Sequence, residues 1–119
     1  MMRALLLVLA AGLSVGAKRD LLAGRVAGEP RDCISLTQNV SPTIVDQRTI
    51  LYRESGRRIW RTTPVGACPS LRPDSILIID VFGAQLCRND RFRTLVPNTI
   101  IPSGYCRFDR FTPYDRSAR

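Results

Sequence analysis

The chain contains no histidine, and Lys18 is the only lysine among its 119 residues. The absence of histidine removes the commonest general base, the Ser-His-Asp and Cys-His catalytic arrangements, and the usual protein ligands of zinc and copper. Arginine supplies nearly all of the positive charge: 18 basic residues oppose 10 acidic ones, which gives a formal net charge of +8. Such a chain attracts anionic partners. Because the arginines are dispersed along the sequence, the same composition also fits an ordinary solvated surface.

Long apolar runs are scarce as well. The longest covers residues 4–17, follows a short basic start, and is closed by Lys18-Arg19-Asp20. It is shorter than the roughly 20 apolar residues that a membrane-spanning helix needs. It also ends in Val15-Gly16-Ala17, a small-x-small sequence of the kind that signal peptidase cleaves. We therefore predict a signal peptide at residues 1–17, cleaved after Ala17, and no membrane span in the mature chain.

All four cysteines, Cys33, Cys68, Cys87 and Cys106, follow this leader. An even number of cysteines in a short exported chain predicts disulfides, and hence a periplasmic or secreted location. Structural zinc sites usually pair cysteines about two to four residues apart, whereas consecutive cysteines here are nineteen or more apart, so we expect no metal and no cofactor. Of the connectivities open to four cysteines, we predict Cys33 with Cys106 and Cys68 with Cys87. The first and last strands would then be joined, as closure of a sheet requires.

One domain is expected, since the mature chain is too short for two. Residues 18–32 carry Gly24, Gly28 and Pro30 among scattered charges and are predicted to form a flexible tether. A single β domain is predicted at 33–114, followed by a C-terminal tail at 115–119.

The domain shows the period-two alternation of strands and no convincing helical period. Ile34 and Leu36, for example, alternate with Ser35 and Thr37. The near-continuous apolar run Ile76 to Ile79 predicts a central strand. We expect an all-β fold, a small disulfide-stapled antiparallel sandwich or barrel of about 6–7 short strands. Beyond the first strand, at 33–38, the predicted strands are 49–53, 58–62, 75–82, one beginning at 85, 92–96 and 105–108.

Five pieces of the chain, taken in order, resemble a family of small exported bacterial proteins with four cysteines. The resemblance extends over nearly the whole mature domain, and it implies export and the limits of the domain. It implies no activity and no catalytic residue. The pieces are Cys33-Ile34-Ser35-Leu36, residues 46–51, Cys68-Pro69-Ser70-Leu71, residues 86–90, and the closing segment from Gly104-Tyr105-Cys106 to Phe111-Thr112-Pro113.

The strongest candidate for binding is the hairpin predicted at 48–62, whose turn contains Gly56, a residue able to take the positive φ that such turns need. Arginines interleaved with an aromatic ring suit anionic groups, because the guanidinium fork donates two parallel hydrogen bonds. If Ile59 faces inward, Trp60 faces solvent, and the opposite parity stays open. We expect an acidic envelope polymer or protein as partner and no specific nucleic acid. The candidate binding residues are Arg53, Arg57, Arg58, Trp60 and Arg61.

Carboxylates are the remaining candidates for catalysis. Asp80 and Asp90 could face one another across a hairpin, as a glycosidase pair does. Aspartates at strand ends and in turns more commonly accept hydrogen bonds from nearby backbone N–H groups, so we predict no catalytic residue. The predicted function is that of a non-enzymatic exported envelope protein or binding module. The alternatives are a structural accessory protein without a ligand and a carboxylate-based hydrolase.

Overall fold

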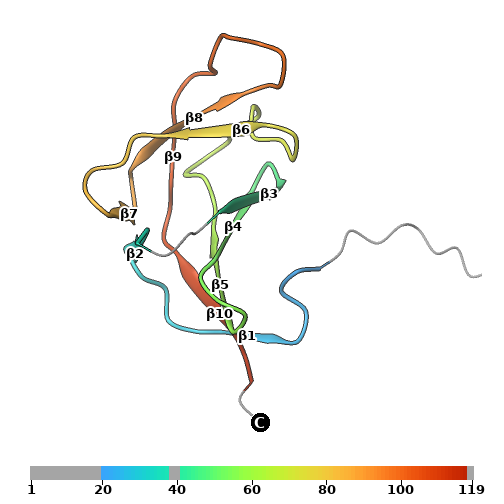
Figure 1. Ribbon diagram of the computed structural model, residues 1–119, viewed down its shortest axis with the longest axis vertical. Helices are drawn as coiled ribbons and strands as arrows, with labels where there is room; N and C mark the ends of the chain where they lie inside the picture. Colours follow the sequence, from blue (N-terminus) through green and yellow to red (C-terminus); the bar gives the residue numbers. More distant parts are fainter. Residues whose placement is uncertain (1–19, 38–40, 118–119) are drawn as a thin grey trace, which may run out of the picture.

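The computed structural model describes residues 20–37 and 41–117, which form ten β-strands and no helix (Figure 1). The prediction of an all-β fold is confirmed. The predicted signal peptide lies outside the described residues. Within residues 20–37 and 41–117 there is no helix that could cross a membrane. The strands are β1 (Arg25–Ala27), β2 (Cys33–Ser35), β3 (Pro42–Asp46), β4 (Thr49–Arg53), β5 (Arg58–Thr62), β6 (Ile76–Ile79), β7 (Gln85–Cys87), β8 (Arg91–Leu95), β9 (Cys106–Arg107) and β10 (Thr112–Arg116).

The strands form three antiparallel sheets. The largest has the order β1-β10-β5-β4-β3, a second has the order β6-β8-β9, and β2 pairs with β7. In Figure 1, β1 lies near the lower end of the molecule, whereas β6 and β8 lie in its upper part. The hairpin β4–β5 has the predicted bounds, with Tyr52 opposite Trp60.

A side chain holds the turn of this hairpin. The Ser55 hydroxyl accepts hydrogen bonds from the N–H groups of Arg57 and Arg58, both at 3.2 Å. The N–H of Glu54 in turn donates to the Arg58 carbonyl at 3.1 Å. Gly56 does not take a positive φ. The role predicted for Gly56 is therefore wrong, because serine hydrogen bonds to the backbone shape this turn instead.

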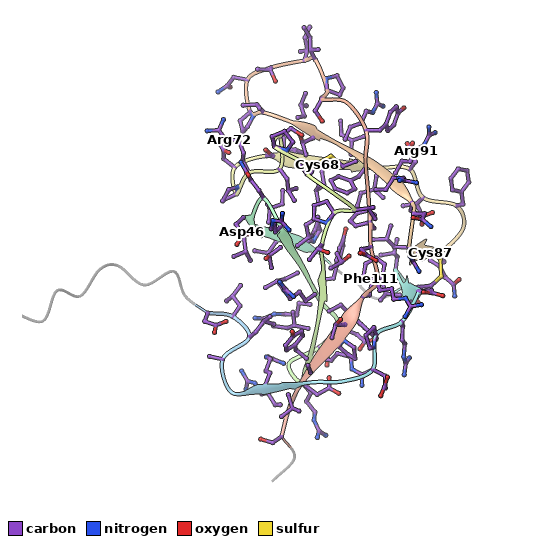
Figure 2. The ribbon with its side chains drawn as sticks, turned by 180° about the vertical axis from the view of Figure 1, so that it is seen from behind. Asp46, Cys68, Arg72, Cys87, Arg91 and Phe111 are labelled. Atoms are coloured by element: carbon purple, nitrogen blue, oxygen red, sulfur yellow. A yellow bond between two sulfur atoms is a disulfide. The ribbon has the colours of Figure 1, made fainter. Side chains whose placement is uncertain are left out.

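An aromatic cluster joins the two larger sheets. Phe108, between β9 and β10, has its ring centroid 4.4 Å from that of Phe92 in β8 and 6.5 Å from that of Tyr52 in β4. Phe111 lies 5.9 Å from Phe108 and 6.4 Å from Tyr52. All four rings are buried, and their tilted and edge-on contacts are the geometries that aromatic pairs prefer. Figure 2 shows Phe111 in the interior of the molecule.

The apolar strand β6 lies at an edge of its sheet, not at the centre. Only Leu77 and Ile79 pack against the core. Ile76, which lies on the other face, is 53 % exposed. The prediction of a central strand is therefore wrong, and the central strand is β8. A continuous apolar run does not by itself show that both faces of a strand are covered.

The largest sheet begins earlier and ends later than the predicted domain. Strand β1 lies within residues 18–32, the predicted tether, and pairs with β10, Arg25 standing opposite Arg116. The N–H of Arg31 donates to the Phe111 carbonyl at 2.7 Å, and the N–H of Phe111 donates to the Arg31 carbonyl at 2.9 Å. Segments from the two ends of the described chain thus lie side by side.

All four cysteines form disulfides, as predicted, but the predicted pairing is wrong. Cys33 is bonded to Cys87, and Cys68 is bonded to Cys106. The predicted pairing assumed that the strand of Cys87 pairs with the strand before it. Instead β7 pairs with β2, which places Cys33 and Cys87 directly opposite one another.

Candidate anion-binding face

The two faces of the five-stranded sheet differ in character. Side chains alternate along a strand, and directly opposed residues of neighbouring strands share a face. Tyr52 and Trp60 are opposed and both belong to the apolar core. Leu51 and Ile59, each one position away, are buried but lie outside that core cluster. They therefore belong to the outer face, which the core does not cover.

The outer face carries four arginines from four neighbouring strands. Arg25 of β1 lies opposite Arg116 of β10. Arg61 of β5 directly follows the core residue Trp60, and Arg53 of β4 directly follows the core residue Tyr52. Because side chains alternate along a strand, both arginines point away from the core, to the outer face. Arg53 and Arg116 are exposed, while Arg25 and Arg61 are half-buried. These four residues, Arg25, Arg53, Arg61 and Arg116, are called the arginine face below.

The apolar residues beneath the arginine face explain its partial burial. Arg61 lies opposite Leu51, and Arg53 lies opposite Ile59. Tyr114 of β10 is the other cross-strand neighbour of Ile59. Arginine stems commonly cover apolar surface while the guanidinium stays in water. The arrangement thus shields Leu51 and Ile59 and leaves the charged groups available to a partner.

No carboxylate of these four strands shares the arginine face. Asp115 is their only acidic residue, and it points to the inner face. Within the described residues, no carboxylate lies within 4.0 Å of Arg53, Arg61 or Arg116. Burial, together with the positive charges of Arg116 and Arg53, lowers the pKa of the Arg25 guanidinium, against a smaller opposite effect of Asp115. Arg116 and Arg53 therefore repel Arg25, and a bound anion would relieve that repulsion.

Arg25 also holds the sheet together at this end. Its guanidinium donates hydrogen bonds to the carbonyls of Arg57 at 2.8 Å, Gly56 at 3.1 Å and Tyr114 at 3.4 Å. The side chain thereby ties β1 to the turn of the β4–β5 hairpin. Of the four arginines, Arg25 is thus the one with a clear structural role.

Two of the predicted binding residues lie on the inner face. Arg58 donates hydrogen bonds from Nε and Nη2 to Asp115, both at 2.8 Å. Its guanidinium lies 5.2 Å from the centre of the Trp60 ring, and that of Arg31 lies 5.7 Å from it. Trp60 itself is only 4 % exposed. The hypothesis that Trp60 offers an aromatic surface to a ligand is therefore wrong, since Ile59 points outward instead.

Arg57 extends the positive surface around the end of the sheet. It is exposed at the hairpin turn and lines a hollow of about 350 Å³ beside Arg116. The two carboxylates of this hollow, Glu54 and Asp115, both lie near Arg58, at 3.8 Å and 2.8 Å. Arg57 thus lies in the exposed turn, in a hollow that it shares with Arg116 of the arginine face and with the Arg58–Asp115 pair.

The aspartates considered for catalysis serve local contacts. Asp80 forms an ion pair with Arg91 at 3.7 Å, and Asp90 accepts the Cys87 N–H at 2.7 Å. A further hollow, of about 390 Å³, lies between β3 and β6 and has no titratable side chain in its lining. No group of three potential metal ligands occurs in the described part of the chain. The lining residues are Pro42, Thr43, Ile44, Pro73, Ser75, Ile76 and Leu77.

Comparison of the chain with protein-family models, curated proteins and solved structures finds no match. The resemblance to small exported bacterial proteins therefore stays a prediction, and the site is interpreted from its geometry. Sequence reasoning missed Arg25 and Arg116, because they lie outside the predicted domain limits. Residues 112–116 contain a proline and no clear apolar alternation, so the local sequence carries little signal for β10.

Proposed function

We propose that the protein is a non-enzymatic binding module whose arginine face holds an acidic polymer or acidic protein of the cell envelope. The observation that carries this proposal is the placement of four arginines from four adjacent strands on one face, with no carboxylate from those strands beside them. The guanidinium fork binds carboxylate or phosphate through two parallel hydrogen bonds and stays charged at any relevant pH.

The extent of the face favours a partner with many anionic groups. Neighbouring strands are about 4.8 Å apart, so the four strands extend over about 14 Å. A single small anion contacts only part of such a surface. A polymer or an acidic protein segment presents several charges in succession and engages Arg25, Arg53, Arg61 and Arg116 together.

The experiment measures binding of the purified, oxidised chain to two defined probes, poly-glutamate and polyphosphate, at low and high salt. Arg53→Gln/Arg61→Gln should weaken binding at low salt by about tenfold or more, since both groups are charge-assisted donors. The difference should shrink at high salt because exposed charges are screened.

A matched control removes the same charge elsewhere. Arg72 and Arg88 lie in connections outside the five-stranded sheet and are exposed. Arg72→Gln/Arg88→Gln should bind both probes nearly as well as the unmodified chain. If the two double variants weaken binding equally, attraction follows net charge alone and the proposal fails. Capture of an acidic component from envelope extract by the unmodified chain, and not by the Arg53/Arg61 variant, would support it.

We further propose that the chain is exported to the periplasm or secreted. Both disulfides support this, because such bonds persist mainly in oxidising compartments. The mature protein recovered from fractionated cells should begin at Lys18 on N-terminal sequencing. Retention of Met1 would contradict cleavage after Ala17.

A further inference from the structure

The connection between β8 and β9 exposes apolar side chains at the opposite end of the molecule from β1 (Figure 1). Ile100 is 93 % exposed and the adjacent Ile101 is 81 % exposed. Ile76, on the neighbouring strand and opposite Leu95, adds further exposed apolar surface at the start of this connection. Adjoining aliphatic side chains left in water mark interaction sites more often than chance.

Hydrogen bonds at the base fix this loop. The Ser103 N–H donates to the Thr94 carbonyl at 2.8 Å, and the Thr94 N–H donates to the Ser103 hydroxyl at 2.9 Å. The Thr94 hydroxyl also donates to the Ser70 carbonyl at 3.1 Å. Near the tip, Thr99 N–H bonds to the Val96 carbonyl at 3.1 Å. The two isoleucines are thus presented on a closed loop.

Two arginines of β8, the strand that leads into the loop, lie against an aromatic ring at the other end of the loop. Tyr105, which follows the loop, is 53 % exposed. The guanidinium carbons of Arg91 and Arg93 lie 4.5 Å and 5.0 Å from the centre of its ring. Residues 91–108 contain three arginines and no acidic residue. Asp80, 3.7 Å from Arg91, is the nearby carboxylate. In Figure 2, Arg91 lies near the surface, away from Phe111.

We propose that this end of the protein docks on the surface of an anionic lipid bilayer. Ile100 and Ile101 enter the boundary of the acyl chains, Tyr105 lies at the level of the headgroups, and Arg91 and Arg93 bind lipid phosphates. An apolar loop with cations on the adjoining strand complements a surface that is apolar within and anionic outside. An acidic protein would satisfy the arginines but would not cover the isoleucines.

This proposal is independent of the proposed function, because it uses no residue of the arginine face. The strand β1, which carries Arg25, lies at the opposite end of the molecule from the β8–β9 connection (Figure 1). A chain docked through the loop therefore holds Arg25 and Arg116 away from the membrane, free to bind another partner.

The test is co-sedimentation of the whole oxidised chain with vesicles of phosphatidylcholine, with or without phosphatidylglycerol. The unmodified chain should bind the vesicles that contain phosphatidylglycerol and bind neutral vesicles more weakly. Ile100→Ser/Ile101→Ser should weaken binding about tenfold or more at both low and high salt, since apolar insertion is not screened. Buried Trp60 reports folding, and its emission should be unchanged in the variant.

Two further variants serve as controls. Phe82 is 78 % exposed in another loop, so Phe82→Ser removes a comparable apolar side chain and should leave vesicle binding intact. Arg88→Gln/Arg110→Gln removes two exposed arginines that belong to neither surface, and this variant should also bind vesicles normally. Equal vesicle binding by the isoleucine variant and the unmodified chain would overturn the proposal. A shift from dimer to monomer in that variant, without an effect on vesicles, would overturn it too and assign the loop to self-association.

Discussion

Arg58 and Asp115 form a bidentate pair across β5 and β10, with both hydrogen bonds at 2.8 Å. The hydrogen bond from Arg58 lowers the pKa of Asp115, and the positive charges of Arg58, Arg57 and Arg25 act in the same direction against a desolvation effect that raises it. The pair joins the β4–β5 hairpin to β10, the strand that carries Arg116, and so it positions two parts of the proposed site.

This pair should make stability depend on pH. Because the pKa of Asp115 is lower in the folded chain, its charged form stabilises the fold above the ordinary carboxyl pKa of about 3.9. The contribution is lost as the pH falls through the folded value. Asp115→Asn should therefore lower the urea midpoint at neutral pH, and the difference from the unmodified chain should vanish in strong acid. A difference that stays constant with pH would contradict this explanation.

Tyr52→Phe should leave the protein equally stable or more stable. The Tyr52 hydroxyl is buried and has no hydrogen-bond partner among the described residues, and burial raises its pKa. An unsatisfied buried hydroxyl costs about 1 kcal/mol or more, which the phenylalanine would not incur. Urea denaturation would measure the change, with Tyr114→Phe, at a half-buried position, as the control. A loss of more than about 1 kcal/mol would indicate a partner for this hydroxyl.

Single substitutions should distinguish the arginine that stabilises the fold, Arg25, from an arginine that only carries charge, Arg53. Arg25→Ala deletes three hydrogen bonds to backbone carbonyls and should lower the free energy of unfolding by about 1 kcal/mol, since the site is partly solvated. Arg53→Gln relieves repulsion and should change stability by no more than about 0.5 kcal/mol. Thermal denaturation at low salt would compare them. Equal destabilisation by both changes would refute the division of roles.

Each disulfide should contribute strongly to stability. The bonds close loops with sequence separations of 54 and 38, each worth about 4 kcal/mol in the chain-entropy model. Cys33→Ser/Cys87→Ser and Cys68→Ser/Cys106→Ser should therefore each lower the urea midpoint markedly.

Cleavage beside aspartate is the suitable method for mapping the two disulfides, because trypsin does not cut efficiently before Pro73 and leaves Cys68 and Cys87 on one peptide. Recovery of Cys33 linked to Cys68 would contradict the observed pairing.

The local patterns of this sequence predict its elements well where they are contiguous. The β4–β5 hairpin has the bounds predicted from its strand pattern, although Ser55 and not Gly56 shapes its turn, and the all-β class follows from the absence of a helical period. Pairing between distant segments was not predictable in the same way. The contacts of β1 with β10, and of β7 with β2, depend on which surfaces the rest of the chain leaves free, and short strands carry little pattern of their own.

The residues of the candidate site also differ in how far the sequence predicts them, according to whether they lie in one hairpin or in distant strands. Arg53, Arg57 and Arg61 were predicted from their proximity in one hairpin; the structure has Arg53 and Arg61 on the outer face of the sheet and Arg57 in the exposed turn. Arg58 and Trp60 belong to the inner face, because packing decides which side chains of β5 face the core. Trp60 joins the core, and Ile59 does not. Arg25 and Arg116 enter the site only through tertiary pairing of the two chain ends.

Neither disulfide joins cysteines that follow one another along the chain. Cys33 passes over Cys68 to reach Cys87, and Cys68 passes over Cys87 to reach Cys106. A polypeptide that enters an oxidant N-terminus first presents Cys33 and Cys68 together before either native partner has emerged. Oxidation in order of emergence therefore links the wrong sulfurs, and thiol–disulfide exchange must undo that link. For a chain oxidised in that order, maturation would include an isomerisation step, which a disulfide isomerase would accelerate.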